Sequence, residues 1–150
     1  MSNNSNFITD FSKSDFTVKY QLEFYNYWLK LKGERNMPSR ADISPHDIVP
    51  ILPMIMLFDY LPDTGDFNIR LVGTGCTNFV GEKKNNLEGI ESYGESCDRF
   101  KWCVKNKKPY FIISTLESIN KSHINYSAIV LPLSEDNENV NMIILANHFY

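Results

Sequence analysis

The carboxyl-terminal third of the chain contains three consecutive segments with the pattern of β-strands, and this constrains the fold more than any other feature. Apolar and polar residues alternate along residues 110–116 and 124–130, and a period of two is that of a strand with one buried face. After the polar turn at 134–139, residues 140–150 carry apolar side chains at both odd and even positions. This pattern is typical of a central strand that is covered on both faces. Three strands joined by short turns predict an antiparallel sheet.

The rest of the chain adds helices and two more strands. A helical repeat of apolar residues begins near residue 15 and ends at Gly33, and strand patterns cover 54–61 and 67–73 with a turn sequence between them. Residues 75–108 lack alternation and predict short helices, the longest at about 95–106. The order helix, two strands, helices, three strands places the chain in the α+β class.

The length of 150 residues predicts one domain. Residues 1–13, rich in Asn and Ser, predict a flexible amino-terminal arm, and residues 14–150 form the domain. With 15 basic and 18 acidic residues the net charge is −3. This charge does not favour binding to the phosphates of nucleic acid. No apolar run approaches the roughly 18 residues that cross a bilayer, so no membrane partner is expected.

The three cysteines predict free thiols in a reducing compartment. Their odd number and the lack of a C-x-x-C pair argue against a disulfide framework. The first residues lack the basic start and apolar core of a signal peptide. The expected localisation is cytoplasmic.

The amino-terminal helix has two apolar stripes. The first consists of Val18, Leu22, Tyr25 and Leu29, and the second of Tyr20, Phe24, Tyr27 and Leu31. A helix with two such stripes is either buried from both sides or in contact with another chain. Its terminal position favours the second reading slightly, and we therefore predict a homodimer through the second stripe.

Four blocks of sequence resemble a known family. They are YWLKL at 27–31, MPSRADISPHDIVPILP at 37–53, IRLVGT at 69–74 and LPLS at 131–134. Together they are similar to a bacterial family of small stand-alone PAS-like proteins, and the similarity covers roughly residues 20–148. The chain departs from the family pattern at 81–89, which is longer and more basic than the usual turn.

The resemblance implies a PAS-like five-stranded antiparallel sheet with helices over one face and an amino-terminal helix. It also implies a sensory or adaptor role in signal transduction. Haem-binding PAS domains carry a histidine between the second and third strands, and residues 75–108 contain none. The flavin motif has no match at Asn85–Glu88, so haem and flavin are disfavoured and no cofactor is predicted.

The strand registers predict one shared interior face. Its residues are Ile69, Leu71, Phe79, Phe100, Ile112, Ser114, Tyr126, Ala128 and Ile144. Either these side chains enclose a small apolar ligand, oriented by Ser114 and Tyr126, or they fill the core. A shift of one residue in register would turn any strand's set to the other face.

The leading interpretation is a non-enzymatic regulatory module that binds itself and an unidentified signalling protein. His46, His123 and His148 have neither triad-like context nor metal-ligand spacing, and no catalytic or metal-binding residue is predicted. The alternatives are a small enzyme with Asp59 or a histidine as base in an apolar pocket, and a passive carrier of a small molecule.

Overall fold

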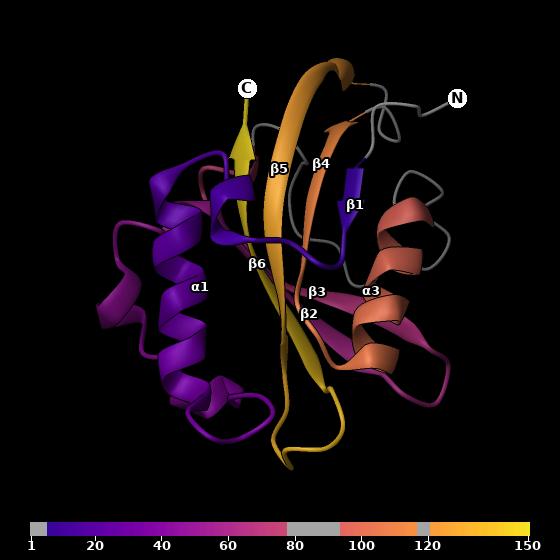
Figure 1. The fold of residues 1–150 in the computed structure, drawn as a ribbon. Coiled ribbons are helices and arrows are strands. Elements are labelled where there is room, and N and C mark those ends of the chain that lie inside the picture. Colours follow the sequence, from indigo (N-terminus) through magenta and orange to yellow (C-terminus); the bar gives the residue numbers. More distant parts are fainter. Residues whose placement is uncertain (1–5, 78–93, 117–120) are drawn as a thin grey trace.

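The computed structural model of the chain describes residues 6–77, 94–116 and 121–150. These residues form an antiparallel sheet with the strand order β1-β4-β5-β6-β2-β3. Figure 1 shows helix α1 on one side of the sheet and helix α3 on the other. The elements are β1 (Asn6–Ile8), η1 (Lys13–Asp15), α1 (Lys19–Lys32), η2 (Arg40–Asp42), η3 (Pro45–Ile48), η4 (Leu52–Met54), β2 (Ile55–Leu61), β3 (Asp66–Val72), α3 (Gly94–Asn106), β4 (Tyr110–Leu116), β5 (Lys121–Leu133) and β6 (Met142–Phe149), where η denotes a 3-10 helix.

The predicted α+β fold with an antiparallel sheet and an amino-terminal helix is confirmed. Strand β6 is central, since it pairs with β5 on one side and β2 on the other. Three consecutive residues of this strand, Ile143, Ile144 and Leu145, are all buried. Side chains on both faces of β6 are apolar because one helix covers each face of the sheet.

The sheet has one more strand than the five that were predicted. Residues 6–8, within the expected arm, form β1, and Phe7 pairs with Ile112 of β4. The Phe7 ring packs edge-on against Tyr110 and Trp102, with ring centroids 4.9 and 5.5 Å away. These aromatic contacts hold the short strand in place. The division of the chain at residue 13 itself remains a prediction.

The segment between α1 and β2 follows the surface as three short 3-10 helices, and we call residues 34–54 the wrap. Its ion pair joins Arg35 Nη2 to Asp42 Oδ2 at 2.8 Å. The same carboxylate oxygen accepts the backbone N–H of Ser39 at 2.8 Å. These contacts hold the first part of the wrap in place.

A β-bulge separates the two ends of the β2–β3 hairpin. Phe58 pairs with Ile69 and Leu57 pairs with Leu71, so Arg70 is the extra residue. An extra residue reverses the alternation of side chains beyond it. Ile69 is therefore buried, whereas Leu71 is 43% exposed.

Candidate functional site

Six of the predicted interior residues lie on the sheet face toward α3 or on α3 itself. Ile112 pairs with Ala128, and Ser114 pairs with Tyr126, so these four side chains share a face. Phe100 of α3 packs on the same side. The buried members are Ile69, Phe100, Ile112, Ser114 and Ala128, while Tyr126 is half-buried.

Two predicted interior residues lie on the other face, and Phe79 lies outside the described residues. Ile144 pairs with Leu131 of β5. Leu131 is three residues from Ala128, an odd number, so Leu131 and Ile144 point to the opposite face, which α1 covers. Leu71 is turned to that face by the bulge. The prediction was wrong for both residues because the strand register and the bulge depend on cross-strand pairing.

Aromatic rings fill part of the space between α3 and the sheet. The Phe100 ring lies 4.8 Å from Phe58 and 5.3 Å from Phe67, measured between centroids. One residue before Phe100, the Arg99 guanidinium donates to the Tyr126 hydroxyl at 3.2 Å. The interior face therefore combines a packed apolar end with a polar end at Arg99 and Tyr126.

The other face of the sheet holds α1 through a ring of hydrogen bonds. Thr17 Oγ1 donates to Gln21 Oε1 at 3.1 Å, and Gln21 Nε2 donates to Ser127 Oγ at 3.1 Å. Ser127 closes the ring by donating to Thr17 Oγ1 at 2.5 Å, because the single hydroxyl proton of Thr17 is already used. Such a closed ring favours one position of the helix on the sheet.

The buried line of α1 contains only one residue of the predicted stripes, Phe24 of the second. It consists of Gln21, Phe24 and Trp28, and Trp28 Nε1 donates to the Pro132 carbonyl at 3.0 Å. Gln21 is fully buried although sequence analysis did not select it. Gln21 precedes Phe24 by three residues and Trp28 by seven, which places all three on one face of a helix. This spacing was the sequence signal that Gln21 is buried.

Asn147 of β6 connects the two faces of the sheet. Its carbonyl, one residue beyond the last β2–β6 pair at Ala146, accepts the hydroxyl of Tyr20 from α1. Its side-chain amide donates to Cys76 Sγ at 3.7 Å, and the Cys76 thiol donates to the Pro53 carbonyl at 3.6 Å. A displacement of Cys76 or Tyr20 would therefore act through Asn147 on the other face of the sheet.

Cys76 and Tyr20 predict a loss of stability at alkaline pH. Burial raises the pKa of Cys76 from 9.0 to about 11. Burial, with a smaller contribution from the neighbouring Cys76, raises the pKa of Tyr20 from 10.0 to about 12. Both groups stay protonated in the folded chain, so their contribution is complete below the unfolded pKa values and is lost between about pH 9 and 12. Urea unfolding near pH 8 and near pH 10.5 measures this loss.

The double variant Cys76→Ala, Tyr20→Phe is the control for this pH dependence. It lacks both titrating groups, so its free energy of unfolding should fall less than that of the wild type over the same pH interval. Equal losses of unfolding free energy in the two proteins would show that Cys76 and Tyr20 do not cause the pH dependence.

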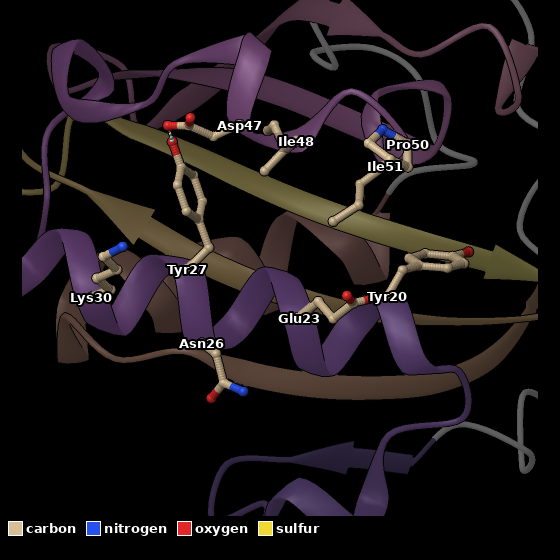
Figure 2. Close-up of a pocket in the computed structure, with 9 residues that line it drawn as sticks. All are labelled: Tyr20, Glu23, Asn26, Tyr27, Lys30, Asp47, Ile48, Pro50 and Ile51. Carbon is tan, nitrogen blue, oxygen red and sulfur yellow. Dashed lines mark hydrogen bonds between the residues drawn. The ribbon is translucent and has the colours of Figure 1, made fainter.

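A groove lies between α1 and the wrap (Figure 2). Its volume is about 440 Å³. Tyr27 holds the two walls together, because its hydroxyl donates to Asp47 Oδ2 at 3.0 Å and accepts the Ser44 N–H at 3.1 Å. The lining residues are Tyr20, Glu23, Asn26, Tyr27, Lys30, Asp47, Ile48, Pro50 and Ile51.

The groove brings together only part of the predicted dimer stripe. Tyr20 and Tyr27 line it and are half-buried, and Leu31 is also half-buried. Phe24 is 1% exposed and packs in the core of its own chain, so its assignment to an interface was wrong. The stripe is largely covered by the sheet and the wrap, which accounts for its apolar character within one chain.

Among the described side chains, the suggested catalytic bases Asp59, His46 and His148 do not meet in an apolar pocket, and the side chain of His123 lies outside the described residues. Asp59 accepts both Nε and Nη2 of Arg70, at 2.9 and 3.1 Å, in an exposed ion pair. His46 is exposed on the wrap, and His148 stacks on Tyr150 with ring centroids 5.1 Å apart. This arrangement does not support the alternative of an enzyme with Asp59 as a buried base.

In the described part of the chain, neither helix is long and apolar enough to cross a membrane. A search of curated proteins found no similar sequence. The model of the PAS domain family, in contrast, matches residues 16–144. This match spans α1, the wrap and all strands of the sheet except β1, although it stops within β6. PAS domains are in general sensory and regulatory modules rather than enzymes, and this chain belongs to the PAS domain family.

Proposed function

We propose that this chain is a cytoplasmic regulatory module that acts through protein–protein contact at the groove between α1 and the wrap. Its first partner is a second copy of the chain, and a signalling protein uses the same face. The interior face toward α3 accepts a small apolar ligand whose binding shifts the position of α1. The groove, a concave surface with the apolar floor Ile48 and Ile51, is the observation that carries the proposal.

The contacts of α1 support a role as the movable element. The helix is held on the sheet by a small set of hydrogen bonds around Gln21 and Tyr20 as well as by apolar packing. Because Asn147 contacts Cys76 on one side and Tyr20 on the other, a ligand that moves Asn147 also changes the docking of α1. A ligand shifts this equilibrium only by its difference in affinity for the two positions.

Native mass spectrometry tests the partner and the ligand together. The wild-type protein should give a dimer, and Asn26→Arg should give a monomer, because this exposed groove residue would bring a second charge beside Lys30 in each copy. A mass excess that is present in the native spectrum and lost on denaturation would identify the ligand.

The matched control is Asn68→Arg on β3, a half-buried position outside the groove. It adds the same charge and should leave the dimer unchanged. A monomeric wild-type protein, or equal dissociation of both variants, would contradict the homodimer at this groove. A native mass without excess would contradict a tightly bound ligand and leave the protein contact as the function.

A further inference from the structure

Four lysines lie along α3 and just after it. Lys101, Lys105, Lys107 and Lys108 are all exposed. The ion pairs among the described residues are Arg35–Asp42 and Arg70–Asp59, so no described carboxylate forms an ion pair with these lysines. In a chain of net charge −3 they form a local positive surface, which attracts acidic groups more strongly than the average charge would suggest.

Two adjoining hollows lie beside these lysines. They share Tyr60 and Val104, both half-buried, as an apolar floor. The first has a volume of about 260 Å³ and the second about 430 Å³. The first is lined by Tyr60, Gly65, Lys101, Val104 and Lys105, and the second by Tyr60, Pro62, Val104, Lys107, Glu135, Asp136, Asn139, Val140 and Asn141.

Packing and hydrogen bonds hold two sides of the hollows, α3 and the β5–β6 turn. Phe100 and Cys103 anchor the opposite side of α3 in the core. The β5–β6 turn is fixed by Asp136, whose carboxylate accepts the backbone N–H groups of Glu138 and Asn139 at 2.8 and 2.7 Å. Figure 1 shows the carboxyl end of α3 beside the β2–β3 hairpin. A preformed surface of this kind binds without a large ordering cost.

We infer that the two hollows, here named the α3 groove, bind an acidic segment of a partner protein that also carries an apolar side chain. The apolar side chain would cover Tyr60 and Val104, and its acidic neighbours would lie against Lys101 and Lys105. This surface lies on the face of the sheet away from α1, so the inference goes beyond the function proposed above.

The chemistry of the groove favours a protein segment over a polyphosphate such as nucleic acid or an anionic membrane. Glu135 and Asp136 line the far end, and their carboxylates repel a continuous row of phosphates. Phosphate contacts also do not cover an apolar floor, whereas burial of an aromatic or aliphatic side chain there is favourable. Opposite charges at the two ends would orient the bound segment.

The test uses the full chain and a fluorescein-labelled peptide in which one tryptophan follows a single run of glutamate. Fluorescence anisotropy should show saturable binding that weakens with salt. The double variant Lys101→Glu, Lys105→Glu should bind about tenfold more weakly or worse, since two attractions become repulsions. A peptide with glycine in place of tryptophan should also bind more weakly because it leaves the floor uncovered.

The matched control is Lys13→Glu, Lys19→Glu, which makes the same change in net charge at exposed positions before and at the start of α1. It should bind the peptide as the wild type does. Circular dichroism confirms that both double variants are folded. Absence of wild-type binding, equal loss in both variants, or displacement of the peptide by single-stranded DNA or phosphatidylserine vesicles at lower concentration would overturn the inference.

Discussion

Trp28→Ala should lower the free energy of unfolding by about 3–5 kcal/mol, the usual cost of removing a large aromatic side chain from a core. For a domain of this size the midpoint of thermal unfolding would fall by roughly 10 °C. The ring is 3% exposed and stacks near Tyr25 at a centroid distance of 6.3 Å. Its loss leaves a cavity between α1 and β5 that the rigid sheet does not fill.

The measurement is urea unfolding followed by circular dichroism, because Trp28 is one of only two tryptophans and its removal changes the fluorescence signal. Trp28→Phe is the matched control. It keeps an apolar ring but leaves the Pro132 carbonyl without its donor, at a cost of about 1–3 kcal/mol. The stability should therefore decrease from wild type to phenylalanine to alanine. A wild-type stability for the alanine variant would show that α1 does not pack on the sheet as described.

Gly73→Ala should lower the free energy of unfolding by about 3 kcal/mol or more, at the upper end for overpacking. A Cβ atom at Gly73 would lie 2.3 Å from the carbonyl oxygen of Pro53 and 2.6 Å from that of Leu52. Both are backbone atoms, so the end of the wrap must move away from the end of β3. The movement also disturbs the thiol of Cys76, which donates to the same Pro53 carbonyl.

Gly65→Ala separates this steric effect from the ordinary cost of replacing a glycine. Gly65 has φ +77° and open space around its Cβ position, so the alanine costs only about 1–2 kcal/mol for the left-handed backbone. Urea unfolding of both variants measures the difference. If Gly73→Ala were no more destabilised than Gly65→Ala, the close approach of the wrap to β3 would be contradicted.

The candidate site could be predicted only in part. Ser114, Tyr126, Ile112 and Ala128 share the α3 face as expected, because regular alternation along β4 and β5 is visible in the sequence. Ile144 was assigned to the wrong face because β6 is apolar at both parities and its sequence contains no indication of register. Leu71 was misplaced by a bulge that exists only in the pairing of β2 with β3.

The sequence by itself determined the order of the elements, the α+β class and the resemblance to the PAS family. Local features carry that information: period-two alternation, the end of α1 at Gly33, and the proline-rich block at 37–53. Only the tertiary structure decided that α1 packs on the face opposite α3, that Gln21 is buried in a hydrogen-bond ring, and that Asn147 joins Tyr20 to Cys76. Partners such as Gln21 and Ser127 are 106 positions apart in the chain, and contacts of that range depend on how whole elements pack rather than on any local pattern.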